Sequence, residues 1–565
     1  MRKNRITKKF QKIIPFASIA LSLFAFAIAF KDLPRIYFLN DEWTQMGSVF
    51  ANGLFAGISP NILLQVTGRF RFIGSLINNV FFYYFPGNAT PFVIFGYAVG
   101  SINIILAYFV VKKMTKNSLL SLLCILSVAV PTSGQQAISW FGAVVQTTLS
   151  STMVYLAFII RPPTLAVGKK VLILLSFVFL YIAFLFKNSC IFVLPLLLFS
   201  PYFFSKNKID ILRFFRKYAG IFALFIFFVA WNMYLLFQFK SIAEMATATQ
   251  ILIRIIFNSV WYPFISISHM MISPRTLFRT SEHFGVFLYQ FLGVAANKDI
   301  IVVTILSDMI STLLSFILIG GFLLVYLKMK QRRRLLVFGL LWYVLSFLPM
   351  AMYLPERNSS FLESRYLYYS IFGFGLIFGV GVEYVSVILR RFFGVMPSIC
   401  IVAFILLFFY WKQISFVQRD VYENVLYSMD IQKLIVDMNR IVPMLSEKPI
   451  FYISGDRNFF YQNNVVPFQY GTGFMIMMAF RERNEIPRQL IREKYLSRFL
   501  EEGYKEIGGE GFGYFWQKES LCNLFHKDRA LRTDQVIGLY YFGNERKLID
   551  ITGDIRKEID MRCIN

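Results

Sequence analysis

The sequence predicts an all-α polytopic membrane protein that carries a small α/β domain at its C-terminal end. Hydrophobic residues make up 57% of the 565 residues and charged residues only 16%, a balance typical of integral membrane proteins. The apolar residues gather in runs that approach the length of a bilayer crossing, and the composition turns polar only after about residue 413. We therefore expect a transmembrane domain over residues 1–411 and an extracytoplasmic α/β domain over residues 412–565.

The first apolar run, residues 13–30, follows the basic leader MRKNRITKKFQK. The sequence AIA just before Phe30 has the form of a signal-peptidase site, so cleavage is one alternative. We expect the run to remain as an uncleaved first span, because it is about long enough to cross a bilayer.

Ten further apolar runs follow, which gives about eleven predicted transmembrane helices. The runs lie near residues 91–111, 119–131, 144–160, 171–186, 191–204, 219–237, 300–327, 335–354, 367–389 and 398–410. Two more apolar stretches, at residues 250–268 and 284–296, are either amphipathic helices in the membrane interface or an extra pair of spans. The second alternative gives thirteen spans and changes the side of no other loop.

The basic residues predict the orientation, because cytoplasmic loops carry the excess of Lys and Arg. The basic loops that fall on the side of the N-terminus are Lys112 with Lys113, Arg161 with Lys169 and Lys170, residues 205–217, residues 328–334, and Arg390 with Arg391. The net charge of +26 is thus explained by membrane anchoring, and we expect no nucleic-acid partner. The expected location is a plasma (inner) membrane with the N-terminus in the cytoplasm and the C-terminal domain outside.

The C-terminal region has the alternating pattern of an α/β domain, which we expect to fold by itself from about residue 415. Helices are predicted at residues 421–446 and 481–503, and strands at residues 449–455, 464–470, 508–516 and 536–543. No nucleotide-binding glycine fingerprint occurs there, which argues against a soluble nucleotide-sugar transferase domain. Cys522 and Cys563 either pair as a disulfide in an oxidising compartment or remain free thiols.

The sequence predicts no metal site. It has no CxxC and no HExxH motif, and its three histidines, His269, His283 and His526, are far apart. No cofactor is indicated, and a requirement for a divalent metal ion is not supported by any ligand spacing.

Two adjacent carboxylates, Asp41 and Glu42, lie in the segment LNDEWTQ a few residues after the first apolar run. A carboxylate held close outside a membrane span is suited to act as a general base. Acidic residues in such places are more often solvated or structural. Arg69 and Arg71 follow in the same predicted outer loop, where arginines bind phosphate through paired hydrogen bonds or extend to lipid headgroups.

Five blocks in this order resemble the successive signatures of glycosyltransferases of the GT-C fold, and most closely the protein O-mannosyltransferase-like group in its bacterial form. The blocks are LNDEW, GRFRFIGSLINNVFFYYFPGNATPF, QQAISWFGAVVQTTLSSTMVYLAF, FLFKNSCIFVLPLLLF and FLESRYLYYS. The resemblance covers about residues 12–411. It implies a GT-C-like membrane domain, a sugar donor linked to a polyprenyl phosphate, an active site on the outer face, and an Asp in the first outer loop as the base.

The resemblance assigns roles to named residues. Asp41 is the expected base for the acceptor hydroxyl, and Glu42 is expected to orient the acceptor. The cations expected at the donor phosphate are Arg69, Arg71, Lys187 and Arg365, and the side chains expected at the sugar or lipid are Trp140 and Tyr366. One base is enough for such a transfer, because the leaving lipid phosphate is already a stable anion.

Two departures and two rival functions stay open. The segment SGQQAISW lacks the acidic or His residue that several relatives place there, and FKNS replaces their Lys-Glu pair, so metal use is undecided. The expected reaction transfers a hexosyl or pentosyl group to a hydroxyl of a glycan, lipid or protein. The rivals are a transporter or flippase of a lipid-linked saccharide and a non-catalytic envelope protein.

Overall fold

The computed structural model describes residues 2–39, 41–58, 71–162, 170–204, 248–291, 300–351, 364–456, 472–480, 502–543 and 545–564, with isolated positions between 205 and 247. Contacts within the chain divide it into two compact units. The first comprises Met1–Leu33, Ser59–Gly74 and Ile94–Tyr422, and the second comprises Pro34–Ile58, Ser75–Val93 and Glu423–Asn565. The predicted class is confirmed in its coarse form, because the described chain is mostly helical and ends in a small sheet domain.

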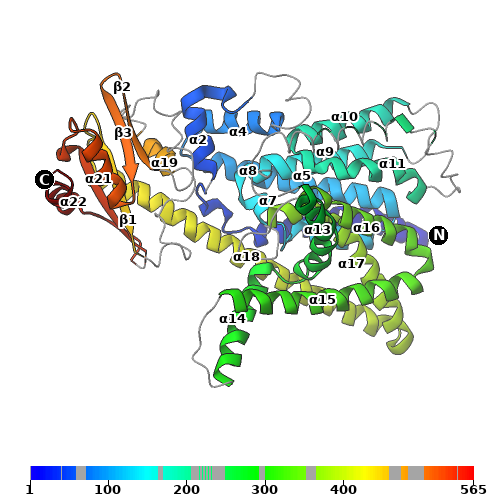
Figure 1. Cartoon of the computed structure of the whole chain (residues 1–565). Coiled ribbons are helices and arrows are strands. Elements are labelled where there is room, and N and C mark those ends of the chain that lie inside the picture. The colour runs from blue at the N-terminus through cyan, green and yellow to red at the C-terminus, as the bar shows by residue number, and fades with distance from the viewer. Residues whose placement is uncertain are drawn as a thin grey trace. The chain divides into compact units, whose positions relative to one another are not determined.

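The first unit is built from helices (Figure 1). They are α1 (Arg2–Ala29), α5 (Thr90–Thr115), α6 (Ser118–Ala129), α7 (Gln136–Ser139), α8 (Phe141–Ala143), α9 (Leu149–Ile160), α10 (Lys170–Phe186), α11 (Val193–Phe204), α13 (Ala248–His269), α14 (Pro274–Phe291), α15 (Ile300–Lys328), α16 (Arg333–Leu345), α17 (Ser364–Phe393) and most of α18 (Val395–Ile441). Helix α18 continues into the second unit.

Within the described residues, six helices are long and apolar enough to cross a membrane. They are Thr90–Thr115, Phe141–Ile160, Val302–Lys328, Lys330–Met350, Ser364–Phe393 and Val395–Ile441. The pair Leu252–His269 and Pro274–Phe287, bent by 79°, is a seventh candidate. Four shorter apolar helices match predicted runs: Ile13–Ala29, Ser118–Ala129, Val171–Phe186 and Asn188–Phe203. The predicted count of eleven to thirteen spans is not confirmed, because hydropathy detects apolar runs whose helices fall short of the roughly 30 Å hydrocarbon core. The run at 219–237 lies almost wholly outside the described residues.

Helix α17 is the packing centre of the first unit, and it contacts α6 and α16. A Cβ atom at Gly373 would lie 2.6 Å from the carbonyl oxygen of Gly339 on α16, and one at Gly375 would lie 3.1 Å from Cys124 on α6. Only glycine allows backbones to approach so closely, as is common where helices pack in membranes. This packing fixes the start of α17, where two predicted site residues lie.

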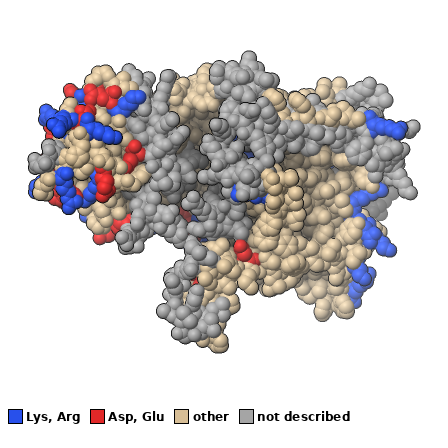
Figure 2. All heavy atoms as spheres, viewed as in Figure 1, with Lys and Arg blue, Asp and Glu red and all other residues tan. Residues whose placement is uncertain are grey.

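Basic residues gather at one end of the helices of the first unit, as Figure 2 shows for the described Lys and Arg side chains. They lie in the last turns of α5, α15 and α17, and at the start of α16: Lys112, Lys113, Lys328, Arg333, Arg390 and Arg391. Contacts join these ends, since Lys113 Nζ donates to the carbonyl of Arg161 over 2.6 Å and Arg332 pairs with Glu383 at 2.9 Å. Such a one-sided distribution is typical of helices that cross a membrane.

The second unit contains a five-stranded sheet of β1 (Ile450–Gly455), β2 (Gly503–Ile507), β3 (Glu510–Phe515), β4 (Val536–Phe542) and β5 (Lys547–Asp550) in the order β2-β3-β1-β4-β5. Strand β1 pairs in parallel with β3 and β4, and the outer strands pair antiparallel. The strands predicted at residues 449–455, 508–516 and 536–543 are confirmed. The strand at 464–470 and nearly all of the helix at 481–503 lie outside the described residues.

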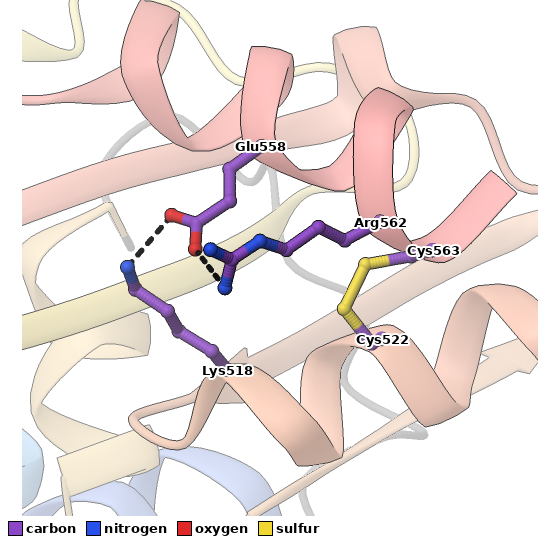
Figure 3. Close-up of a disulfide and its surroundings, with 5 residues drawn as sticks. All are labelled: Lys518, Cys522, Glu558, Arg562 and Cys563. Carbon is purple, nitrogen blue, oxygen red and sulfur yellow. Dashed lines mark hydrogen bonds and ion pairs between the residues drawn. A yellow bond between two sulfur atoms is a disulfide. The ribbon is translucent and has the colours of Figure 1, made fainter. Parts of the chain in front are cut away.

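Helices α21 (Lys518–Lys527) and α22 (Thr552–Ile559) supply a core with the sheet, whose members include Ile450, Tyr452, Phe525, Val536 and Ile555. A disulfide joins Cys522 of α21 to Cys563 just after α22, which decides the alternative left open by the sequence. Figure 3 shows this bond beside the ion pairs that Glu558 makes with Lys518 and Arg562. Closing a loop of 41 residues in the unfolded chain stabilises the domain by about 4 kcal/mol in the chain-entropy model.

Candidate functional site

Five predicted site residues form one network in the first unit, which we call the cation–aromatic cluster: Arg71, Trp140, Lys187, Arg365 and Tyr366. The Lys187 ammonium lies 5.4 Å from the centre of the Tyr366 ring, and the Arg365 guanidinium lies 5.0 Å from the same ring. Arg365 also lies 4.0 Å above the Trp140 ring. Cation–π contacts of this kind contribute on the order of 0.5–2 kcal/mol each. Residues from three distant parts of the sequence thus converge.

Arg71 and Lys187 are joined through two neighbouring residues of one short segment. Arg71 donates a hydrogen bond from Nη1 to Oε1 of Gln146, and Lys187 donates from Nζ to Oγ1 of Thr147 over 2.6 Å. Helix α4 (Phe72–Tyr84) starts directly after Arg71, and a Cβ atom at Gly74 would lie 3.1 Å from the carbonyl of Phe186. This close approach of the start of α4 to the end of α10 places Arg71 and Lys187 against neighbouring residues of the same segment.

The segment that holds Gln146 and Thr147 is a π-helical turn, Val144–Thr148, between α8 and α9. Such turns are frequent at functional sites. Its backbone is supported by the buried Asn103 of α5, which donates to the carbonyl of Thr148 over 2.8 Å and accepts from Thr152 over 2.9 Å. The Thr152 hydroxyl also donates to the Thr148 carbonyl, over 3.1 Å, so this carbonyl is satisfied in the apolar interior.

Arg365 is oriented by the segment Gln136–Trp140 as well as by Tyr366. Its backbone N–H donates to Oε1 of Gln136 over 3.4 Å, and its Nη2 donates to the Tyr366 hydroxyl over 3.3 Å. The N–H of Gln136 in turn donates to Ser364 Oγ over 3.1 Å. The first turn of α17 and the short helix α7 are therefore held together, with the guanidinium between two aromatic rings.

The cluster combines positive charge with a partly dry environment. Lys187 is only 3% exposed, and burying an ammonium group is costly unless polar groups surround it. Gln146, Thr147 and Trp140 are neutral groups, and their contacts orient the three cations. Oriented cations of this kind are suited to bind an anion such as a phosphate.

A small pocket lies further along α17 in the same unit. It is lined mostly by apolar atoms, with a few polar groups from Ser127, Thr132, Ser133 and Gln413. Its α17 lining, Ile371 and Phe374, lies about 9 to 14 Å beyond Arg365 along the helix axis at 1.5 Å per residue. The lining residues 130–133 lie just before α7 in the chain, and the pocket and the cluster share α17.

The two predicted carboxylates belong to the second unit. The expected loop at Asp41 is wrong, because α2 (Asp41–Asn52) begins at that residue; an acidic residue favours a helix start. The Asp41 side chain lies outside the described residues. Glu42 is 3% exposed, and its Oε2 accepts the backbone N–H of Leu39 over 2.7 Å. A carboxylate that reaches back three residues is a typical helix-start contact.

Helix α2 is held by several elements of the second unit. The N–H of Tyr37, just before it, donates to Ser428 Oγ of α18 over 2.9 Å. Asn79 of α4 donates to the carbonyls of Leu54 and Ala56, just past its end, over 2.8 and 2.9 Å. Helix α19 (Thr472–Ala479) of the C-terminal domain packs against α2. The sheet domain and the carboxylate helix are thus parts of one unit.

Sequence reasoning missed the residues that connect the cluster, namely Asn103, Gln136, Gln146 and Thr147. The available signal was polar residues inside otherwise apolar runs, such as QTT at residues 146–148. Arg69 lies outside the described residues. Within the described part of the chain, no three His, Cys, Asp or Glu residues are grouped as metal ligands would be, and a metal requirement stays undecided.

No protein-family model matches this chain, and no curated protein sequence matches it.

Proposed function

We propose that this protein is a membrane glycosyltransferase that takes a sugar from a polyprenyl-phosphate-linked donor and transfers it to an acceptor hydroxyl on the outer face of a plasma membrane. One observation carries the proposal: Arg71, Lys187 and Arg365 converge through Gln146, Thr147 and Tyr366. In this role the three cations bind the donor phosphate and stabilise the charge that develops on it as the sugar leaves.

The surroundings of the cluster suit a lipid-linked donor better than a free sugar phosphate. Trp140 and Tyr366 offer aromatic surface beside the cations, on which a sugar ring or the first part of the lipid packs. Lys187 also lies 5.9 Å from the centre of the Tyr369 ring. A donor whose phosphate is attached to an apolar chain matches cations that lie beside aromatic rings.

Asp41 is the proposed general base of the reaction. It would take the proton of the acceptor hydroxyl while the oxygen attacks the anomeric carbon and the lipid phosphate departs with the bonding electrons. The buried contact of Glu42 with the N–H of Leu39 supports a positioning role for Glu42 at the start of α2, in addition to the orientation of the acceptor that the resemblance implies.

The proposed outer location of the site follows from charge and helix direction. Arg365 begins α17, and Arg390 and Arg391 end it, so the cluster lies at the end opposite to the basic end of this helix. The positive-inside rule assigns the basic end to the cytoplasm. The disulfide between Cys522 and Cys563 supports an outer location for the C-terminal domain as well, because disulfides persist in oxidising compartments.

The function is tested with purified protein in liposomes that contain a polyprenyl-phosphate donor with a radiolabelled sugar. We expect label to appear in a hydroxyl-bearing acceptor fraction from membranes of the source cell, and to do so only with intact protein. Movement of the lipid between leaflets without transfer would instead identify a flippase. Neither transfer nor movement, with a panel of hexosyl and pentosyl donors, would favour a non-catalytic envelope protein.

A further inference from the structure

Helix α14 is packed on only part of its circumference. Leu277, Ser281 and Gly285, spaced by four residues, are buried along one side of the helix. This side contacts α15, and a Cβ atom at Gly285 would lie 3.4 Å from the side chain of Leu306. The packed side therefore anchors α14 to the first turns of a membrane-length helix.

A second side of α14 carries a row of exposed phenylalanines. Phe284, Phe287 and Phe291 are 44%, 58% and 78% exposed. Their rings are stacked along the helix, with neighbouring centroids 6.4 Å apart and planes tilted by 24° and 22°. Exposing three adjacent aromatic rings to water is unfavourable, so the row needs an apolar environment that the described residues do not provide.

A third side is polar and also exposed, with Arg279, His283 and Gln290. At 100° per residue, the phenylalanine row lies between the packed side and this polar side. An amphipathic helix that lies in a membrane surface has this arrangement, with its apolar side in the acyl chains and its polar side in water and headgroups.

The start of α14 contacts α18 close to the point where the apolar part of α18 ends. Thr276 near its start accepts a hydrogen bond from Arg419 of α18, eight residues past Trp411. Lys412 lies 4.8 Å above the Trp411 ring, and such Trp and Lys pairs are typical of the membrane interface. Helix α14 is also bent by 79° from α13, and it runs across the direction of α15 (Figure 1).

The phenylalanine row continues a surface that faces lipid. Ile305 and Met309 of α15 flank Leu306, the residue that α14 covers, and they are 53% and 63% exposed. Both belong to a helix that is long and apolar enough to span the membrane. Lipid that surrounds this part of α15 therefore also meets the exposed side of α14.

We propose that α14 is a membrane-surface helix whose row of Phe284, Phe287 and Phe291 inserts into the acyl chains of the leaflet next to the start of α15. The surface is a lipid-binding surface, and its partner is the bilayer itself. The helix is then neither half of a membrane span nor a docking site for another protein. This inference does not depend on the transferase activity.

The test uses spin labels at single positions of the reconstituted full-length protein and measures how deep each label lies in the bilayer. Phe287→Cys is labelled in a Cys400→Ser background, because Cys400 is an exposed free cysteine. Arg279→Cys, exposed on the polar side about 80° around the helix from Phe287, is the matched control, and Leu313→Cys, exposed in mid-α15, is the reference for full depth. Collision with oxygen reports the acyl region, and collision with a water-soluble nickel chelate reports the aqueous phase.

We expect the ratio of oxygen collisions to nickel collisions to be at least about threefold higher for the label at residue 287 than for the label at 279. The label at 287 should also lie shallower than the label at 313. Phe291→Cys, at the most exposed position, repeats the measurement if the first variant does not fold. Three results would overturn the proposal. Equal nickel access at 287 and 279 would place both sides in water, and exclusion of both reagents from 287 would mean that protein covers the row. A depth at 287 equal to that at 313 would mean that α14 is part of a span.

Discussion

Arg365→Ala is expected to lower both donor binding and transfer by about 10- to 150-fold, because the loss of hydrogen bonds to a charged group costs about 1.5–3 kcal/mol. Arg365 contacts both aromatic side chains of the cluster, Trp140 and Tyr366. Its loss removes a proposed phosphate ligand and the cation above the Trp140 ring, while Lys187 still lies beside the Tyr366 ring. Titration with the lipid donor and initial rates of transfer measure the two effects.

The matched control for this change is Arg391→Ala, at the other end of α17. Both variants remove one arginine from the same helix, so a general effect of lower charge or weaker membrane anchoring would appear in both. Normal donor affinity in Arg365→Ala, or equal losses in the two variants, would contradict a phosphate site at the cluster.

Asp41→Asn is expected to lower the rate of transfer about 100-fold or more while the affinity for the donor stays unchanged. The change keeps the size of the side chain and an acceptor oxygen, and it removes basicity. It also separates the two proposed tasks, because the base acts on the acceptor and the cations act on the donor. Single-turnover rates and donor binding are measured on the same preparation.

Glu42→Gln is the companion variant. A glutamine oxygen still accepts the N–H of Leu39, so the start of α2 should be retained, and transfer should fall less than in Asp41→Asn because only the orientation of the acceptor is affected. A loss in Glu42→Gln as large as that in Asp41→Asn would mean that the pair acts through the shape or charge of the segment. Full activity in Asp41→Asn would remove Asp41 from the mechanism.

The coarse fold was predictable because apolar composition and strand alternation are local properties of the chain. The strand at residues 449–455 was found from its own residues. The number of spans was not predictable in this way, since a run such as residues 119–131 forms a helix of 12 residues, Ser118–Ala129. Hydropathy measures how apolar a segment is, whereas this helix is bounded by the Asn117 cap at its start and by Pro131 after its end.

The candidate site was predictable in its residue types and less so in its geometry. Arg71, Lys187 and Arg365 were chosen for their charge and their order in the chain, and the structure brings them together. The linking residues Gln146 and Thr147 were missed, because a polar residue in an apolar run has many uses until its partner is known. The helix start at Asp41 was not predicted, because the expectation for Asp41 and Glu42 rested on their acid–base chemistry. Acidic residues also favour the first turn of a helix.

Photo-crosslinking with a lipid donor tests most directly whether the cation–aromatic cluster binds the donor phosphate. A polyprenyl-phosphate sugar with a diazirine on the carbon next to the phosphate is bound to the reconstituted protein, illuminated, and mapped by mass spectrometry. We predict labelling within peptides that contain Trp140, Lys187 or Tyr366, lost in Arg365→Ala and retained in Arg391→Ala. Labelling confined to the lipid-exposed residues of α15 and α18, and unchanged in Arg365→Ala, would contradict the proposed site.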